Sequence, residues 1–578
     1  MTTKRFEGAT MTDQAQDGVR VSWPLCRLAS RGCRGIVVSP NKECWEHLAP
    51  RQWSKALSRL RPGSPLDMRG TRLTSEILGE ILARLQPSED VVRFGVAQFD
   101  HARFCGATEF DHAEFGGPAR FDHAEFSGPV RFERVKFLRG AGFGGASFLG
   151  SARFANTTFS GPARFPGASF SGPAWFGGVE FLGSARFDES SFSGETGFSR
   201  AEFSGTARFS EARFEGPVQI GEASFSGDAH FNGATFARAQ RLGPLVVRGH
   251  LDLEEANFAG RLELEATASS MACVRTHFSD RVVFRLGGGH IALEGVEFPR
   301  PARLEPQQAE QQFRLVSLRR TDASNLVVAG ADLKACQFAG AHNLDKLRIE
   351  GANSFASTPE GWKRGPIVGC GPPLWRWTRR QTLAEEHRLR VERPRRWLGQ
   401  RTPYPALAAK QRDWYPPISR PPDWLTTEEL PPDDELINLY RSLRKAREDG
   451  KDEPGAADFY YGEMELRRLA DHTPWAERFI LTTYWLVSGY GLRGLRALIA
   501  LATVILGVAT LLYHVGFKGV SPSSNWWDSV LYATKATLSL PGTEQLTGWG
   551  EVIRIVLRLT GPVLLGLALL SVRNRVKR

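Results

Sequence analysis

Cysteine is scarce in this chain: seven residues are spread over 578 positions, and their number is odd. A disulfide framework needs paired cysteines in an oxidising compartment, so the sequence argues against a disulfide-rich secreted domain. The first 20 residues are charged and contain no apolar run, so we expect no secretory signal there. Both observations predict a reducing, cytoplasmic environment for the N-terminal part of the chain.

Catalytic signatures are also missing. The sequence contains no phosphate-binding glycine loop followed by lysine, no H-E-x-x-H motif and no G-x-S-x-G nucleophile elbow. Each of these motifs places a reactive group where a substrate can reach it, and their absence argues against the corresponding hydrolases and nucleotide-dependent enzymes. We predict that the protein is not an enzyme.

Positive charge, by contrast, is in excess. The formal net charge is +11 and the sequence pI is about 9.4, which indicates an anionic neighbour such as a membrane surface or nucleic acid. The excess is uneven, because residues 94–240 hold slightly more acidic than basic side chains. The basic residues gather in 376–401 and beside the apolar segments further on. This distribution favours a membrane surface, and we expect no nucleic-acid partner.

Phenylalanine recurs with a regular period. Two series interleave, and within each the spacing is eleven residues. The first series is Phe99, Phe110, Phe121, Phe132, Phe143, Phe154, Phe165, Phe176, Phe187, Phe198, Phe209 and Phe231, with Ile220 in place of one Phe, and the second runs from Phe104, Phe115 and Phe126 to Phe225 and Phe236. The spacing between successive phenylalanines therefore alternates between five and six residues, which neither an α-helix nor a meandering sheet requires. It predicts a chain wound into stacked coils.

Small residues accompany the phenylalanines. Alanine often precedes them by two positions, as Ala102 precedes Phe104, and glycine follows most of the second series by two positions, as Gly150 follows Phe148. Side chains at i−2 and i point to the same side of an extended segment, so both face inward if each unit forms one flat side of a coil. The glycines mark corners, because glycine adopts backbone angles that other residues resist.

These repeats closely resemble the pentapeptide-repeat family, whose unit is centred on A-x-F/L. The segment from Ala331 to Phe338 has the plainest form of the motif. The resemblance implies a mainly β fold, a right-handed quadrilateral parallel β-helix in which two five-residue and two six-residue sides make a coil of 22 residues. The coils would stack at roughly the 4.8 Å strand spacing. The pattern continues weakly from Leu242 to Leu264, then slips and returns at Leu333 and Phe338, so we assign residues 94–350 to this domain.

Residues 1–60 form a small module with a candidate metal site. Cys26, Cys33, Cys44 and His47 have the spacing C-x6-C-x10-C-x2-H. Three thiolates and one imidazole can complete the tetrahedral coordination of a structural Zn²⁺ ion, and C-x2-H resembles half of a zinc knuckle. The first pair does not have the C-x2-C spacing, so three buried thiols in a small module are the alternative interpretation.

Helical segments flank the repeats. Residues 74–86 have a capped amphipathic pattern within a helical cap, 61–93, which we expect to cover the first coil and protect its open edge. Residues 351–432 are rich in Pro, Trp and Arg, and we interpret them as a linker that lies either in a headgroup layer or along the β-helix. Residues 433–471 have the pattern of a helical hairpin, which would couple the β-helix to the segments that follow.

Residues 472–578 are predicted to be a membrane module. Residues 497–515 carry no full charge and are long enough to cross a bilayer, and residues 553–572 form a second apolar segment that two arginines and a proline interrupt. Positive charge lies before the first segment and after the second, which places both flanks in the cytoplasm. We therefore expect a multi-pass protein of a bacterial inner membrane with both termini cytoplasmic.

Between these segments lies a short helical pattern, residues 525–540, which is too short to cross. The order of span, short helix, loop and span resembles the two-transmembrane pore-loop channels, in which the short helix re-enters the membrane and the loop after it lines the ion path. No T-V-G-Y-G sequence follows here, so the resemblance does not imply potassium selectivity. It places these residues along a pore: Thr534, Lys535, Thr537, Ser539, Arg554 and Arg558. The two arginines would lie at the pore mouth or, alternatively, snorkel to the outer headgroups.

Three functions compete on these grounds. In the first, a homo-oligomer encloses an ion-channel-like pore, since one two-span chain cannot, and the cytoplasmic β-helix binds a partner or senses a condition. In the second, the spans only anchor a protein-binding scaffold in membrane lipid. In the third, the β-helix mimics DNA, like the pentapeptide-repeat proteins that shield DNA gyrase. The third function needs a strongly acidic cylinder, whereas residues 94–240 are close to neutral.

Overall fold

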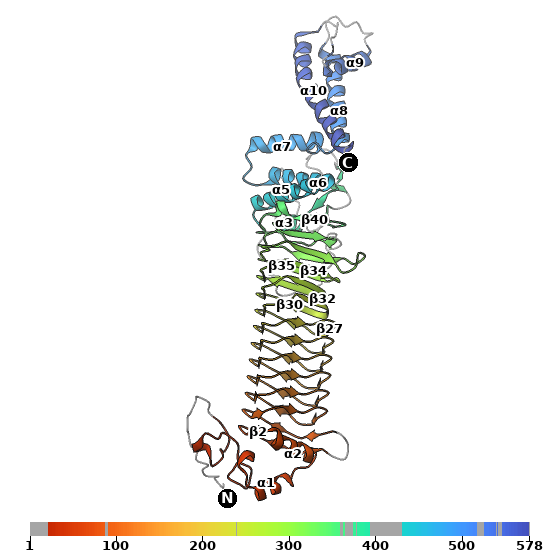
Figure 1. Cartoon of the computed structure of the whole chain (residues 1–578). Helices are drawn as coiled ribbons and strands as arrows, with labels where there is room; N and C mark the ends of the chain where they lie inside the picture. The colour runs from red at the N-terminus through yellow and green to blue at the C-terminus, as the bar shows by residue number, and fades with distance from the viewer. Residues whose placement is uncertain are drawn as a thin grey trace, which may run out of the picture. The chain divides into compact units, whose positions relative to one another are not determined.

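The computed structural model describes residues 21–86, 91–238, 240–358, 362–364, 374–376, 379–392, 431–516, 525–538, 540 and 546–576 (Figure 1). These residues belong to two compact units, Met1–Gly289 and His290–Arg578. In the first unit, short helices are followed by strands, and in the second unit strands are followed by helices.

The first unit begins with a small module, a first coil and a helix. Their elements are the 3₁₀ turns η1 (Ala29–Arg31) and η2 (Trp45–His47), the helix α1 (Pro50–Leu57), the strands β1 (Leu66–Asp67) and β2 (Arg72–Thr74), and the helix α2 (Ser75–Leu85). The side chain of Thr74 accepts a hydrogen bond from the N–H of Ile77 and so caps α2 at the predicted position. The helix buries Leu78, Ile81 and Leu85.

Short parallel strands form most of the first unit. The strands from β3 (Arg93–Phe94) to β29 (Thr235–Phe236) are two or three residues long. Ala119 lies opposite Ala141 in the neighbouring strand, and Ala141 lies opposite Ala163. Paired residues are therefore 22 positions apart, which is the predicted coil length. This pairing confirms a parallel β-solenoid.

The phenylalanines form columns inside the solenoid. Phe165 stacks on Phe143 with a ring-centroid distance of 4.7 Å and on Phe187 with a distance of 4.8 Å. It meets Phe154, which lies eleven residues earlier in the same series but in the neighbouring column, nearly edge-on at 5.7 Å. All four rings are buried. Stacked contacts along a column and edge-to-face contacts between columns are both favourable aromatic geometries, and they confirm that the predicted rungs point inward.

The corners need glycine because successive coils nearly touch there. A Cβ atom at Gly150 would lie 2.5 Å from the carbonyl carbon of Gly128, one coil away. No side chain can occupy that space while the coils keep their strand spacing. The glycine pattern of the sequence is therefore a steric requirement of stacking.

The coil length changes toward the end of the first unit. Three longer strands lie there: β30 (Arg241–Asp252), β32 (Leu262–Val274) and β34 (Val282–Leu286). Leu242 pairs with Leu264, 22 positions on, whereas Leu251 pairs with Met271, 20 positions on, after two shifts of register. This shortening lies in the stretch from Leu242 to Leu264, where the sequence pattern is weak before it slips.

The second unit begins with further parallel coils. Its strands are β35 (His290–Glu294), β36 (Ala302–Pro306), β37 (Phe313–Ser317), β38 (Leu326–Ala329), β39 (Ala331–Asp332) and β40 (Arg348–Glu350). β35 pairs with β37, β37 with β39, β36 with β38, and β38 with β40, all in parallel. Leu333 and Phe338, where the motif returns in the sequence, are both buried.

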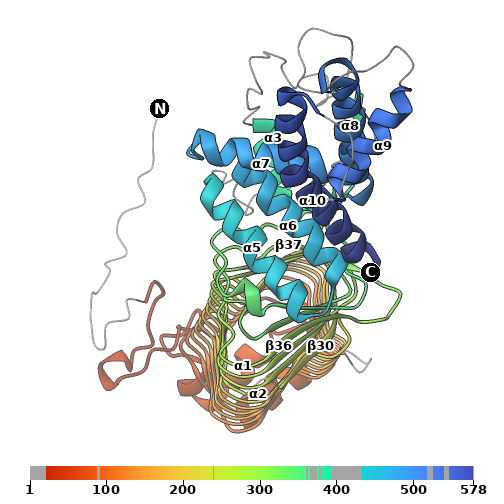
Figure 2. The same ribbon diagram turned by 90° about the horizontal axis from the view of Figure 1, so that it is seen from above.

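Among the described residues, the next helices in the chain are α3 (Ala384–Glu392), α5 (Asp433–Asp449) and α6 (Glu453–Leu469). α5 and α6 pack against one another within residues 433–471, the segment predicted to be a hairpin (Figure 2). Most of the predicted linker, residues 351–432, lies outside the described residues.

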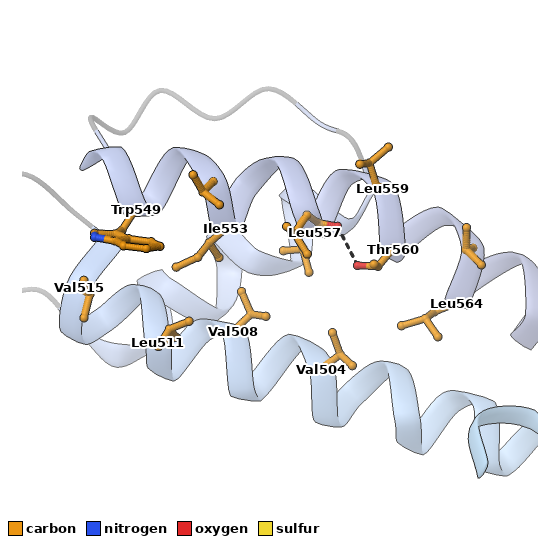
Figure 3. Close-up of a pocket in the computed structure, with 13 residues that line it drawn as sticks. Val504, Val508, Leu511, Val515, Trp549, Ile553, Leu557, Leu559, Thr560 and Leu564 are labelled. Atoms are coloured by element: carbon orange, nitrogen blue, oxygen red, sulfur yellow. Dashed lines mark hydrogen bonds between the residues drawn. The ribbon is translucent and has the colours of Figure 1, made fainter. Parts of the chain in front are cut away.

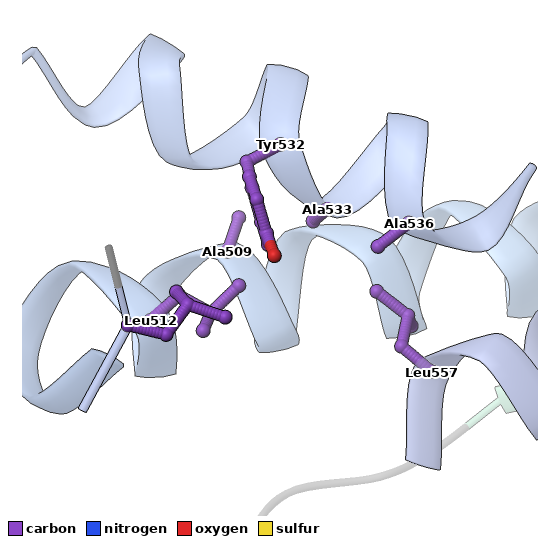
Figure 4. Close-up of a cluster of buried hydrophobic side chains, with 7 residues drawn as sticks. Ala509, Leu512, Tyr532, Ala533, Ala536 and Leu557 are labelled. Atoms are coloured by element: carbon purple, nitrogen blue, oxygen red, sulfur yellow. The ribbon is translucent and has the colours of Figure 1, made fainter. Parts of the chain in front are cut away.

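The last helices are largely apolar. They are α7 (Trp475–Ser488), α8 (Gly494–Leu511) with a π-helical turn at Leu512–Gly516, α9 (Trp526–Thr537) and α10 (Gly548–Val576). α9 is the predicted short helix, and Tyr532, Ala533 and Ala536 on it pack against Ala509 and Leu557 (Figure 4). Within the described ranges, one segment, Gly494–Val515, is long and apolar enough to cross a membrane, by length and composition only.

Candidate metal centre and exposed apolar helices

The fold of the N-terminal module brings four candidate ligands together. The N–H of Cys26 donates to the carbonyl of Gly35, which aligns two segments of the module. Cys44 lies at the N-terminus of η2, and its carbonyl accepts the N–H of His47 at 2.9 Å. One tight turn thus places the Cys44 and His47 side chains next to each other, as the C-x2-H spacing predicts.

The ligand atoms form a compact cluster. The Sγ atoms of Cys33 and Cys44 are 3.6 Å apart, and Nδ1 of His47 lies 3.2 Å from Cys44 Sγ, 3.6 Å from Cys33 Sγ and 3.9 Å from Cys26 Sγ. All four atoms lie within 4.8 Å of one another. Cys26 and Cys44 are buried, whereas Cys33 and His47 are half-buried. This cluster could hold a metal ion, although its first pair does not have the usual C-x2-C spacing.

The pKa values of Cys33 and Cys44 shift in opposite directions. A hydrogen bond from the Cys44 thiol, with a smaller contribution from the His47 ring, lowers the pKa of Cys33 to about 5. The same hydrogen bond, together with burial, raises the pKa of Cys44 above its ordinary value. The lowered pKa favours the thiolate form of Cys33, which is the form that binds a metal.

Exposed large hydrophobic side chains gather on α7 to α10. Trp475 is 83% exposed, Phe479 68% and Leu559 69%, and similar side chains occur along α8, such as Ile499 and Leu506. The solenoid strands expose few such groups. Soluble proteins rarely leave a contiguous apolar surface of this kind uncovered.

A groove runs between α8 and α10. Figure 3 shows Val504, Val508 and Leu511 of α8 opposite Ile553 and Leu557 of α10. The groove has a volume of about 860 Å³. Its lining is almost entirely apolar. Thr560 also lines the groove, but its hydroxyl donates to the Val556 carbonyl of its own helix.

The residues predicted to line a pore occupy different environments. The hydroxyls of Thr534 and Thr537 donate to the carbonyls of Val530 and Ala533 on their own helix, and Thr537 is buried. Lys535 is half-exposed on the same helix.

The two arginines lie on α10. Arg554 pairs with Glu551, and Nη2 of Arg558 is 3.5 Å from the carbonyl of Leu540, just after α9. Ser539 lies outside the described residues. The structure thus brings Arg558 toward the C-terminal end of the short helix, where helix carbonyls favour a cation.

Sequence reasoning missed a buried polar cluster in the second unit. Arg380 and Glu386 form an ion pair at 2.6 Å with side chains only 1% exposed, and the Tyr440 hydroxyl donates to Glu386. Arg380 also faces the rings of Tyr440 and Tyr461. These contacts join the start of α3 to α5 and α6. A helix that begins Ala-Glu-Glu-His carries no apolar period, so the sequence offers no sign that these charges are buried.

Comparison with known proteins identifies the repeats. The family described as Pentapeptide repeats (9 copies) matches the first unit in overlapping segments, at residues 92–136, 110–158, 121–169, 154–201, 165–212 and 198–240. No curated protein and no solved structure matches the chain.

Proposed function

Since residues 92–240 are pentapeptide repeats, we propose that this protein is a membrane-anchored interaction scaffold. In this proposal the solenoid binds a protein partner, and α8 and α10 cross a bilayer. By the positive-inside rule, the basic residues before α8 and at the end of α10 lie on the cytoplasmic side.

One observation carries the membrane part of the proposal: the exposed apolar surface of α7 to α10. At about 25 cal/mol per Å² of apolar surface removed from water, covering these side chains stabilises the protein strongly. A bilayer covers all sides of a helix pair at once. A helix that crosses a bilayer needs about 20 residues, and Gly494–Val515, which contains α8, has 22.

The surface of the solenoid suits a protein partner. Arg164, Arg186 and Arg208 lie opposite one another on successive coils and form a column on one side. Arg186 and Arg208 both bind Asp188, at 2.9 and 3.2 Å, so the column is partly neutralised by acidic neighbours. A mixed, regularly spaced surface favours recognition by a folded partner over mimicry of DNA, which needs a strong excess of negative charge.

A pore is the second candidate function. It is favoured by the packing of the short helix α9 between α8 and α10 and by the position of Arg558 at the end of α9. Several copies of the chain would have to surround one path. Recording from the purified protein in a planar bilayer tests this function: a conductance whose ion selectivity changes in Arg558→Gln would support it, and the lack of any conductance would leave the anchored scaffold.

We also propose that the Cys26, Cys33, Cys44 and His47 cluster is a structural zinc centre. Bonds of about 2.3 Å to sulfur and 2.0–2.1 Å to nitrogen around a tetrahedral ion place two sulfurs about 3.8 Å apart, and a sulfur and a nitrogen about 3.6 Å apart. The spacing in the cluster, 3.6 Å between two sulfurs and 3.2–3.9 Å from sulfur to nitrogen, fits this geometry. Metal analysis should find about one zinc per chain, and Cys33→Ser should lose it.

Flotation on lipid vesicles tests the anchor. The full-length protein should float with vesicles after a wash in high salt or carbonate. Ile499→Lys with Leu506→Lys should remain at the bottom of the gradient, because a lysine near the middle of a span costs roughly 2.5–3.5 kcal/mol.

Leu182→Lys is the matched control, because Leu182 is an equally exposed hydrophobic side chain on the solenoid, and this variant should float like the wild type. A wild-type protein that stays soluble without detergent, or a double variant that floats normally, would contradict the anchor.

A further inference from the structure

The N-terminal module lies directly on the first coil of the solenoid. The N–H of Ile36 donates to the carbonyl of Arg69 at 2.9 Å. A Cβ atom at Gly70, where φ is +61°, would lie 2.3 Å from the carbonyl oxygen of Arg34. Contact this close means that the segment from Arg34 to Ile36 covers the turn between β1 and β2.

Aromatic and cationic groups extend this contact. The indole N–H of Trp23 donates to the Arg34 carbonyl at 3.0 Å. The same ring faces the guanidinium of Arg69 at 5.2 Å and the His101 ring of the second coil at 5.8 Å. The backbone of the module therefore contacts the first coil, and its Trp23 side chain contacts both the first coil, at Arg69, and the second coil, at His101.

The covering segment is held by the four candidate ligands. Cys33 immediately precedes Arg34, and a Cβ atom at Gly35 would lie 2.6 Å from Cys44 Cβ. Without an ion, the side chains of the cluster contact one another through thiols and the His47 ring, and thiols are weak hydrogen-bond donors. With an ion, the bonds from Cys33 and Cys44 would fix both sides of the covering segment, and in small modules this bonding supplies much of the folding free energy.

The first coil needs such a cover. Its strands β1 and β2 pair with the next coil, in which Leu66 lies opposite Ala97 and Leu73 opposite Phe104. The N–H groups of Met68 and Gly70 donate to the carbonyls of the second coil. The other edge of a terminal coil is open to water and to further strands unless something covers it.

From these contacts we infer that zinc at the Cys26, Cys33, Cys44 and His47 cluster fastens the module to the first coil, so that the N-terminal end of the solenoid has a metal-dependent cap. This inference rests on the zinc centre proposed above. Removal of zinc releases the segment from Arg34 to Ile36, and the turn from Met68 to Thr71 becomes accessible to solvent.

Hydrogen exchange of the full-length protein in lipid nanodiscs tests the cap. The zinc-loaded protein is compared with protein treated with a zinc chelator and with treated protein to which zinc has been returned. Chelation should speed exchange at Ile36, Met68 and Gly70 at least tenfold, and zinc should restore the slow rate. Peptides from residues 152–165, in the middle of the solenoid, should not change.

Two glycine variants separate metal binding from capping. Gly70→Ala should keep about one zinc per chain, but its Met68 amide should exchange quickly even with zinc bound, because the new Cβ meets the Arg34 carbonyl and displaces the covering segment. Gly63→Ala has a comparable positive φ, +79°, but open space around its Cβ, so it should exchange like the wild type.

The outcomes are distinct. Equal exchange at Met68 and Gly70 with and without zinc, in protein shown to gain and lose the ion, would overturn the cap and leave the zinc centre intact. If the wild type bound no zinc and Cys33→Ser exchanged like it, the zinc centre itself would be wrong. Cys105→Ser, outside the cluster, controls for the loss of a thiol.

Discussion

Among single residues, Glu385 on α3 has an unusual environment for a carboxylic acid. One of its oxygens accepts the N–H of Phe338, and the other has no hydrogen-bond partner among the described residues. The side chain is 1% exposed, and burial raises its pKa to about 7. In the folded protein, Glu385 therefore stays a neutral carboxylic acid up to about pH 7, where an exposed glutamate is fully charged.

This shift predicts that the second unit loses stability as pH rises. Between about pH 4.5 and 7, the folded state keeps a proton that the unfolded state has released, so the stabilisation is complete below pH 4.5 and is lost through pH 7. The full shift corresponds to roughly 3 kcal/mol. The protection factor of the Phe338 amide, measured by hydrogen exchange at pH 5.5 and 8, should fall at the higher pH.

Glu385→Gln should flatten this pH dependence, because an amide cannot ionise. Glu435→Gln is the control: Glu435 also accepts a backbone N–H, that of Gly340, but its side chain is only half-buried. That variant should keep the wild-type slope. A wild-type protection factor that does not change between the two pH values would contradict the assignment of Glu385 as the titrating group.

At the scale of elements, α9 and α10 approach each other closely at a glycine. A Cβ atom at Gly561 of α10 would lie 2.8 Å from both Cγ2 and the carbonyl oxygen of Thr537 at the end of α9. Gly566, one and a half turns further along α10, has no atom within 4 Å of the corresponding position. The two glycines thus form a matched pair in one helix.

Gly561→Ala should push α9 away from α10 and destabilise their packing by roughly 1–3 kcal/mol, the usual range for overpacking a tight contact. Hydrogen exchange across Trp526–Thr537 should become faster in this variant. Gly566→Ala should leave that exchange unchanged, since alanine favours the helix and meets no neighbour. Equal exchange in Gly561→Ala and the wild type would show that α9 does not depend on this contact.

At the scale of the whole molecule, the solenoid is built from interchangeable coils. Because Ala119 pairs with Ala141 and Ala141 with Ala163, removal of residues 141–162 would let Ala163 pair with Ala119 in the same register. Each coil contacts only its neighbours, so the loss of one should cost little beyond its own share of stability.

The deletion of 141–162 should therefore produce a folded protein that resists trypsin like the wild type and still floats with vesicles. A shorter deletion, residues 141–158, breaks the period and should give a protein that trypsin degrades, because phenylalanines would then face solvent at the junction. Rapid digestion of the first variant, as measured on a gel over time, would contradict the interchangeability of the coils.

The sequence predicted some parts of this protein better than others, for reasons that can be traced to particular residues. The columns of Phe143, Phe165 and Phe187 follow from local alternation and a constant period, which a single chain displays directly. The helices α2, α5 and α6 follow from capping and apolar spacing. The burial of Arg380, Glu385 and Glu386 could not be predicted, because the partners that bury them come from segments far along the chain.

By itself, the sequence determined that the repeats wind into parallel coils with aromatic interiors. Each coil has an aromatic ring, a small side chain and a corner glycine at the same spacing, and this spacing is visible over a few neighbouring residues. It also determined which four side chains could bind a metal. Only the tertiary structure decided that their ligand atoms lie within 4.8 Å of one another, that the segment between Cys33 and Cys44 covers the first coil, and that Gly561 sets the approach of α9. Those features depend on distances between segments that are remote in sequence, and such distances are fixed by packing rather than by any local pattern.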